Sequence, residues 1–517
     1  MRFTSLLAVV LLLAASPASA QGTCTNGSAT MNGVTYECDG IDVLANIPVG
    51  INEPFRTSAL NDIWGWTDPQ DNSEYALVGT RSGTVFVNVT SPTAPRVLGK
   101  LISTGGINTT WRDIKVYQDH AFVGSEATGH GIQVFDLTRL RGLSEDDSRE
   151  FAPDVLYDEV GSSHNVVINE DTGFLYAVGA RTPGPNAPAA CAARGFHAVD
   201  ISTPTSPTFA GCFSDSAQDA MPRITPGYTH DAQCVVYSGP DTEHQGKEIC
   251  LAANEDVVTL FDVSNKGSVS ILSQAQYPLD AYTHQGWFTE DQRYALVNDE
   301  LDETNNLVST QRTLVFDLSD LDNPDLAFVY DSGLTTIDHN NYTLGRFVFQ
   351  ANYESGLRVL DLGEIDSGTL TEIGFFDTYP QSTTAEFNGM WSVYPYFASG
   401  NLIASDSNNG LFVLRPDATL LADADTAIET DYALTAPQPN PATGRTTLSL
   451  QVRESQAVSA RLYDLSGREL ATVYDGTVPV GRTQRLTVDA SALPTGVYVV
   501  RITGETFSTS ERLTVVR

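Results

Sequence analysis

Six stretches of the chain repeat one pattern: a short apolar strand, a turn, a second strand, and a third strand that ends in Asp and an aliphatic residue. Four of the repeats carry a histidine at the same place, at the start of the first strand. These are His164, His230, His284 and His339, at intervals of 66, 54 and 55 residues. A period near fifty residues with several strands per repeat is typical of a β-propeller. Equivalent positions of a propeller converge on its central axis, so the four imidazoles are predicted to meet in one site.

The same order of strands extends to both sides of the histidine repeats. The stretches that begin near Asp62, Arg112 and Gly389 follow it without a histidine in that place. Turn residues (Gly, Pro, Asn and Asp) recur at short intervals, and helical periodicity is scarce. We therefore predict an all-β protein, with a seven-bladed β-propeller over residues 55–416 and a small β-sandwich over residues 437–517.

The segments outside these two predicted domains have compositions of their own. Residues 1–20 have the charged start, apolar run and small-residue end of a secretory signal peptide. That run is too short to cross a bilayer and no other stretch is long enough, so we expect no transmembrane segment. Residues 21–54 are predicted to be a leader that packs on the propeller or closes its last blade. Residues 417–436 are rich in Ala, Asp and Thr and are predicted to be a linker.

The cysteines predict disulfides. Six cysteines in an exported chain point to three bridges, although spacing alone does not determine how they pair. Pairing between nearest neighbours gives Cys24–Cys38, Cys191–Cys212 and Cys234–Cys250. Buried free thiols are the alternative. Disulfides are favoured because the compartment is oxidising and no CxxC or Cys/His spacing typical of a metal site is present.

The net charge of the chain is −35. Residues 437–517 hold 9 basic and 7 acidic residues, which leaves 20 basic and 57 acidic residues for the rest. So acidic a surface repels nucleic acid and anionic lipid, and it suits solubility in salt or cation binding. We therefore expect no nucleic-acid partner.

The C-terminal residues resemble the type A sorting domain of the type IX secretion system. The matching segments are Pro439–Pro441, Tyr463–Arg468, Leu493–Tyr498 and Leu513–Val516. The resemblance implies that residues 437–517 are an export address read by the type IX machinery. It also implies passage through the periplasm and a final location in the medium or attached to the cell surface.

The predicted propeller resembles the choice-of-anchor B family, which is built on Leu-Val-Ile-Val-Asp repeats. The resemblance is carried by third strands such as Leu260–Val263 and Val359–Leu362, by the Ser91–Pro95 linker, and by Ser163–Asn165. That family implies an architecture with varied anchoring tails, and it implies no specific activity.

Polar side chains should surround the histidines at one face of the predicted propeller. First strands start and second strands end at this rim, because successive strands run in opposite directions. The predicted rim residues are Asp62, Arg112, Arg181, Glu255, Glu300 and Glu354, together with Arg81, Glu126, Asp256, Asp299 and Asp406. The neighbours Asp113, Asn165, Asp231 and Asn340 are expected to orient the imidazoles through hydrogen bonds.

The histidines admit two interpretations. Several neutral imidazoles on rigid strands suit a transition metal ion such as Zn, Cu, Fe or Mn, with carboxylates tuning it. Alternatively, each histidine bonds the backbone of the next blade and closes the ring. Calcium is a further candidate cofactor at Asn169–Gly173 or Asp320–Asp325, although such clusters more often form hairpin turns. The five tryptophans fall on predicted first strands, where core packing is expected and stacking on a sugar is the alternative.

Three classes of function follow from these observations. The first is a binding or scaffold module that holds a protein, glycan or small molecule at the propeller face. The second is a metal-dependent hydrolase, lyase or oxidase that uses the four histidines. The third is a purely structural role in the surface layer. A binding module is the leading hypothesis, because propellers often serve as scaffolds and the fold by itself does not specify an enzymatic activity.

Overall fold

The chain folds almost entirely into strands in this computed structural model. The structure describes residues 21–180, 182–188, 191, 195–215, 227–417, 420, 432–435, 437, 439–453, 456–464, 468–478, 484–491 and 493–517. The predicted signal peptide, Arg181 and most of the predicted linker lie outside these residues. The described elements are strands and the short 3-10 helices η1 (Thr104–Gly106), η2 (Leu137–Leu140) and η4 (Ile365–Ser367), which confirms the all-β class. No described helix is long and apolar enough to cross a membrane.

Seven sheets account for most of the described chain, and each has a core of antiparallel strands that follow one another along the sequence. The first strands are β4 (Leu60–Thr67), β8 (Arg112–Tyr117), β14 (Asn165–Asn169), β19 (Asp231–Val236), β23 (Thr283–Phe288), β27 (Asn340–Leu344) and β31 (Met390–Tyr394). The second strands are β5 (Glu74–Thr80), β9 (His120–Ser125), β15 (Phe174–Val178), β20 (Glu248–Ala253), β24 (Tyr294–Asp299), β28 (Phe347–Ala351) and β32 (Leu402–Asp406).

The outer half of each sheet follows the same order. The third strands are β6 (Gly83–Asn88), β10 (Ile132–Asp136), β17 (Phe196–Asp200), β21 (Val258–Asp262), β25 (Arg312–Asp317), β29 (Leu357–Asp361) and β33 (Gly410–Pro416). The fourth strands are β7 (Arg96–Ile102), β12 (Val155–Tyr157), β18 (Thr208–Phe213), β22 (Ser270–Ala275), β26 (Asp325–Asp331), β30 (Thr371–Phe376) and β3 (Ile41–Ile47). The short additional strands are β1 (Ser28–Met31), β2 (Val34–Asp39), β11 (Glu150–Phe151), β13 (Val160–Ser162) and β16 (Thr182–Pro183).

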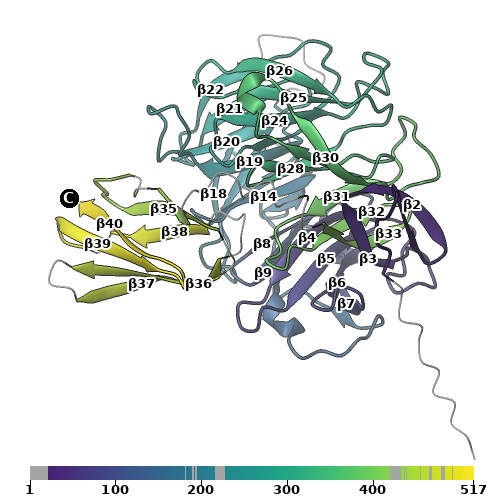
Figure 1. The fold of residues 1–517 in the computed structure, drawn as a ribbon, viewed down its shortest axis with the longest axis horizontal. Helices are drawn as coiled ribbons and strands as arrows, with labels where there is room; N and C mark the ends of the chain where they lie inside the picture. Colours follow the sequence, from purple (N-terminus) through teal and green to yellow (C-terminus); the bar gives the residue numbers. More distant parts are fainter. Residues whose placement is uncertain are drawn as a thin grey trace, which may run out of the picture.

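The first strands form a closed ring. Each contacts the next in the order β4, β8, β14, β19, β23, β27 and β31, and β31 contacts β4. Figure 1 shows β8, β14 and β19 near the middle and β22, β26 and β7 toward the periphery. The N-terminal strand β3 pairs with β33, so the last sheet joins the two ends of this region, while β2 pairs with β30. The arrangement is propeller-like, with strand edges removed by closure.

Burial explains the sequence pattern of the strands. Every residue of β5 is buried, because neighbouring sheets cover both of its faces. The outer strand β26 instead alternates between exposed and partly buried residues. The core lies between adjacent sheets: Leu77 and Phe86 of one sheet pack with Val123 and Phe135 of the next.

Most third strands end in an Asp that closes a turn. The carboxylates of Asp262, Asp317 and Asp361 each accept a hydrogen bond from the backbone N–H two residues ahead. This Asx-type turn directs the chain toward the outer strand. The aliphatic residue that follows, such as Val263 or Leu318, is buried. The repeated Asp-aliphatic motif is therefore structural.

The structure contains the three disulfides expected from nearest-neighbour pairing: Cys24–Cys38, Cys191–Cys212 and Cys234–Cys250. Cys234 and Cys250 are directly paired on β19 and β20, so the third bridge links two strands of one sheet.

The C-terminal region contributes two further sheets, drawn in yellow-green and yellow in Figure 1. One contains β34 (Tyr432–Leu434), β35 (Arg445–Val452) and β38 (Gln484–Asp489). The other contains β36 (Gln456–Asp464), β37 (Glu469–Val478), β39 (Gly496–Thr503) and β40 (Ser508–Val515). Their buried side chains form a single core, in which Leu448 and Leu486 of the first sheet pack with Leu462 and Val500 of the second.

Candidate functional site

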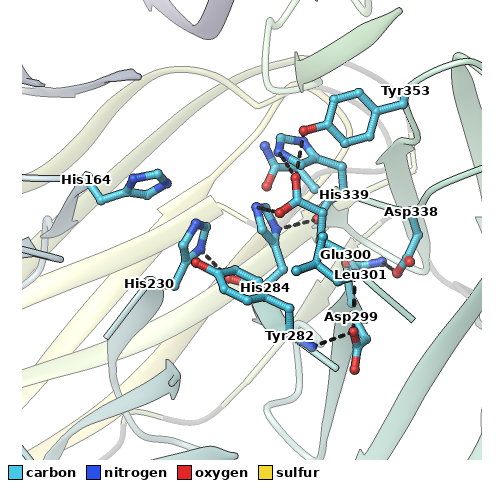
Figure 2. Close-up of polar contacts among 12 residues, drawn as sticks. His164, His230, Tyr282, His284, Asp299, Glu300, Leu301, Asp338, His339 and Tyr353 are labelled. Atoms are coloured by element: carbon cyan, nitrogen blue, oxygen red, sulfur yellow. Dashed lines mark hydrogen bonds and ion pairs between the residues drawn. The ribbon is translucent and has the colours of Figure 1, made fainter. Parts of the chain in front are cut away.

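The four repeated histidines lie side by side at the starts of consecutive first strands. The ring centroids of His164 and His230 are 4.1 Å apart, and those of His230 and His284 are 4.3 Å apart. His284 and His339 are also 4.3 Å apart, and all four side chains are buried. The repeat therefore brings together imidazoles from four sheets (Figure 2).

Backbone carbonyls set the orientation of three imidazoles. The Nδ1 of His230 bonds the carbonyl of His284 at 2.8 Å, and the Nδ1 of His284 bonds the carbonyl of His339 at 3.0 Å. The Nδ1 of His339 bonds the carbonyl of Trp391 at 2.6 Å. A carbonyl oxygen can only accept, so each Nδ1 carries the proton and each Nε2 keeps its lone pair. This is the tautomer that a histidine needs to bind a metal ion through Nε2.

Glu300, at the end of β24, completes a compact set of donor atoms. Its Oε2 lies 3.7 Å from the Nε2 of His284, and its Oε1 lies 3.7 Å from the Nε2 of His339. The hydroxyl of Tyr353 donates to Oε1 at 2.7 Å. Figure 2 shows the carboxylate between the two imidazoles. One donor atom from each of His284, Glu300 and His339 lies within 4.8 Å of the others.

Burial determines the ionisation of these groups. It lowers the pKa of His339 to about 3, and it lowers the pKa of His284 well below the usual value with help from charge on His339. Both imidazoles are therefore neutral at pH 7, as metal ligands must be. Burial also raises the pKa of Glu300 to about 7, against the hydrogen bond from Tyr353, which lowers it. A bound cation would favour the ionised carboxylate.

His164 ends the row with a different partner. Its Nδ1 lies 2.7 Å from Oε1 of Glu126, and charge on His164 contributes to lowering the pKa values of His284 and Glu300. The candidate metal ligands that lie closest together are therefore His284, Glu300 and His339. His230 lies next to His284, and His164 lies next to His230.

The acidic residues deeper in the ring surround a lysine. The Nζ of Lys115 lies 2.6 Å from Asp113 and 3.6 Å from Asp62. Asp62 and Asp113 also accept the backbone N–H groups of Ile114 and Val166, so they join neighbouring first strands. Burial raises the pKa of Asp62 well above its usual value, and burial together with the charge of Asp113 raises that of Asp231 to about 7.

The residues expected to orient the imidazoles have other partners. Asp113 pairs with Lys115, and Asn165 bonds Asp231 rather than a histidine. Asn340 donates to the carbonyl of Trp391, which also accepts from His339. Backbone carbonyls, instead of these side chains, orient His230, His284 and His339. Each carbonyl belongs to the first strand of the following sheet or to the residue just before that strand, which lies beside the imidazole ring.

Other predicted rim residues lie in separate networks. Arg112 is buried and donates to Thr80, Ser103 and His130, and burial lowers its pKa to about 10. Glu354 accepts bonds from Thr384 and Asn388 and so holds the loop before β31.

The backbone of Glu255 bridges to Thr283, and its side chain bonds Tyr282. Arg181 lies outside the described residues. The two turn clusters considered for calcium form Asx turns, in which Asn169 and Asp320 accept the backbone N–H two residues ahead.

A cavity of about 340 Å³ occupies the centre of the ring. The four histidines and the Lys115 carboxylate network contribute to its lining. Aromatic side chains that also line it are Trp64, Trp111, Trp287, Trp391, Tyr342, Tyr394 and Tyr396. The expectation of core packing is correct for Trp66, which is buried, but Trp111 is 44 % exposed. Four tryptophans thus face the cavity.

Tyr353 and the carbonyl of Trp391 are site groups that the sequence analysis did not identify. Tyr353 lies two residues after β28, in the place that Glu300 occupies after β24, because Phe347 and Tyr294 pair with the equivalent Asp361 and Asp317. Alignment of the repeats could have identified it as a rim residue. Every residue has a backbone carbonyl, so the residue type at position 391 could not have indicated that its carbonyl orients His339.

Comparison with known proteins identifies the C-terminal region. Residues 438–516 match the secretion system C-terminal sorting domain. No curated protein matches the chain. The sorting domain, of the type IX system, indicates that the protein is exported to the cell surface or the medium and interacts with the secretion machinery.

Solved structures similar to the chain share little sequence with it. PorZ, a surface component of the type IX secretion system of Porphyromonas gingivalis, is 13 % identical with a TM-score of 0.40. The match covers 95 % of this chain and 64 % of PorZ, so the chain spans about two thirds of that protein.

Two propeller structures of other kinds are also similar. The C-terminal WD40 domain of Sif2 is 10 % identical over 74 % of this chain and 92 % of that domain, with a TM-score of 0.38. The Cps50 (Swd1) β-propeller domain of Myceliophteria thermophila is 12 % identical over 69 % of this chain and 96 % of that domain, with a TM-score of 0.41.

Proposed function

We propose that the protein is an exported surface module that binds a small ligand in the cavity of a seven-bladed β-propeller. In this proposal the propeller spans residues 55–416, and the leader (21–54) supplies the strand that closes it. The linker (417–436) then connects the propeller to a β-sandwich sorting domain (437–517). The cyclic contacts of the seven first strands and the shared core of the two C-terminal sheets support this division. The third-strand repeats support membership of the choice-of-anchor B family.

The observation that carries the binding proposal is the lining of the central cavity. Its volume of about 340 Å³ lies in the range of small-molecule sites. Tryptophan rings such as Trp111 offer apolar faces, and the carboxylates of Asp62 and Asp231 offer hydrogen-bond acceptors. A sugar ring has the matching combination of one apolar face and a polar edge, so a glycan end is the ligand class that we propose.

We further propose that His284, His339 and Glu300 hold one transition metal ion, with His230 the nearest additional imidazole. Zn, Fe, Mn and Cu all accept two imidazoles and one carboxylate. The Nδ1–H bonds to backbone carbonyls support this assignment, because they aim three lone-pair nitrogens away from the strands. The ion would supply a Lewis-acidic contact for a ligand oxygen.

Metal analysis of the purified full-length protein tests the centre. We expect one tightly held transition metal per chain, lost in His284→Ala and in the His230→Ala/His284→Ala double variant. Glycan binding is tested separately, by titrating tryptophan fluorescence with a panel of monosaccharides and oligosaccharides. Absence of metal in the wild type would reject the centre, and absence of any fluorescence response would reject the glycan site.

The alternative function is a metal-dependent hydrolase, lyase or oxidase. One observation favours it: His284 and His339 of the donor set line the cavity, where a ligand could reach an open coordination position. A metal-loaded protein that converts a bound glycan, with His284→Ala inactive, would support the enzyme. Binding without conversion would support the module.

A further inference from the structure

A second cluster of oxygen donors lies behind the candidate metal centre. It consists of Asp302 and Glu303, in the loop after β24, and Asp338, just before β27. The three side chains are 0 %, 6 % and 1 % exposed. One carboxylate oxygen from each lies within 4.8 Å of the others. Figure 2 shows Asp338 turned away from the imidazoles, so this cluster is separate from the histidine row.

Several of these buried oxygens accept no hydrogen bond from outside the cluster. Within the described part of the chain, neither carboxylate oxygen of Glu303 has a donor outside the cluster, and the same holds for Oδ1 of Asp302 and Oδ1 of Asp338. Inside the cluster, Glu303 lies within hydrogen-bonding reach of Asp302, a contact between two carboxyl groups that needs a proton. The remaining oxygens are satisfied: Arg312 pairs with Asp302, and Asn298 donates to Asp338 at 2.6 Å. A buried acceptor left unpaired is costly, and an unpaired buried charge is far more costly.

The charges of the cluster do not balance. Among the described residues, the cation paired with the three carboxylates is Arg312, which contacts Asp302 and whose other nitrogens donate to the carbonyls of Pro278 and Leu279. Two negative charges are therefore uncompensated when all three groups are ionised. The cluster must take up either protons or a cation.

The chemistry of the donors selects the cation. All three are carboxylates, which suit hard ions rather than zinc or copper. Calcium takes six to eight oxygen ligands in flexible geometry and commonly binds one carboxylate through both oxygens. Glu303, whose two oxygens have no donor outside the cluster, fits the bidentate role. A divalent ion also supplies the two positive charges that the cluster lacks.

We propose that Asp302, Glu303 and Asp338 form a calcium site that ties the loop after β24 to the segment before β27. Asp302 follows Glu300 by two residues, and Asp338 directly precedes His339. The ion would therefore hold the backbone on both sides of the candidate metal centre. The calcium site does not depend on the proposed function. The influence of calcium on the transition-metal centre does rest on that proposed function.

The test uses purified full-length protein treated with a chelator and then titrated with CaCl2. We expect saturable calcium binding by calorimetry and a rise in Tm, because an ion that binds the folded state stabilises it. Glu303→Gln keeps the shape of the side chain and removes its charge. Glu303→Gln should weaken calcium binding by about tenfold or more, which is at least the loss typical of removing a group that supports a metal ligand. The variant should also show no rise in Tm when calcium is added.

A matched control is Asp322→Asn. Asp322 belongs to another acidic group, with Asp241 and His244, and its side chain is 51 % exposed. This variant should keep the full calcium response. Should Glu303→Gln fail to fold, terbium luminescence of the wild type, displaced by calcium, provides the second measurement. Absence of calcium binding by the wild type, or an unchanged response in Glu303→Gln, would overturn the proposal and leave protons as the balancing charge.

His284→Ala separates the two sites. This variant should lose transition-metal binding and keep its calcium response. A wild type that binds calcium but no transition metal would reject the proposed metal centre and leave the calcium site standing. A wild type that binds zinc but no calcium would reject the calcium site alone.

Discussion

Replacing Tyr353 with Phe removes one hydroxyl and leaves the packing of the ring in place. That hydroxyl donates to Oε1 of Glu300 at 2.7 Å, and the ring packs on His339 with centroids 4.6 Å apart. Without the hydroxyl, the buried carboxylate loses the donor that orients it between the two imidazoles. We expect the variant to fold normally and to bind a transition metal more weakly.

The size of the effect follows from two separate quantities. A hydrogen bond to a charged group contributes about 1.5–3 kcal/mol, and each 1.4 kcal/mol changes a binding constant about tenfold. Loss of a group that orients a metal ligand typically weakens affinity by about 10- to 100-fold. Both lead to a decrease of about one to two orders of magnitude in zinc affinity for Tyr353→Phe.

The assay is competition for Zn2+ between the chelator-treated protein and a chromogenic chelator, with circular dichroism to verify folding. Tyr342→Phe is the control, because Tyr342 is a buried tyrosine of the central cavity whose hydroxyl bonds Ser392 instead of Glu300. A folded Tyr353→Phe with wild-type zinc affinity would refute the role of Glu300 as a ligand. An equal loss in Tyr342→Phe would show that the effect is not specific to Glu300.

Three further predictions concern stability, ligand binding and export. Burial raises the pKa of Asp406 to about 7 from 3.8, so its ionisation destabilises the folded state as pH rises from about 4 to about 7. At 1.36 kcal/mol per pKa unit the cost approaches about 4 kcal/mol. Asp406→Asn should therefore be more stable than wild type at pH 8, with the gap closing toward pH 4 in denaturant unfolding; a gap independent of pH would contradict this. Trp111→Ala should weaken the fluorescence-detected affinity for a glycan by about 1–3 kcal/mol, the usual contribution of one stacked aromatic ring, whereas Trp66→Phe, in the core, should leave it unchanged. Deletion of residues 437–517 should leave the protein in the periplasm, as measured by cell fractionation, and its appearance in the medium would argue against the sorting role.

Local patterns were sufficient to predict the strand class and the presence of three disulfides, whereas their pairing was assigned to nearest neighbours and then confirmed by the structure. Alternation, turn residues and the recurring Asp of the third strands act over a few residues, so they are visible in any linear sequence. The spacing of His164, His230, His284 and His339 also predicted that these side chains would meet. Repeats of a propeller place equivalent residues at the same height along the central axis and at the same distance from it. The resemblance of the C-terminal segments predicted the sorting domain that the family comparison supports.

Selection among the polar residues of the rim depended on the folded chain. Many carboxylates occupy similar places in the repeats, yet only geometry distinguishes Glu300, beside two imidazoles, from Glu354, which holds a loop. The tautomers of His230, His284 and His339 depend on carbonyls of the next strand, which carry no side-chain signature.

The carboxylates of Glu303 and Asp338 are 35 residues apart and became a cluster through the packing of adjacent sheets. Composition and periodicity are properties of short stretches of chain, so the sequence alone determined which elements form and how often they recur. Electrostatics and ligand geometry depend on distances of a few ångströms between strands from different repeats, and those distances exist only once the ring has closed.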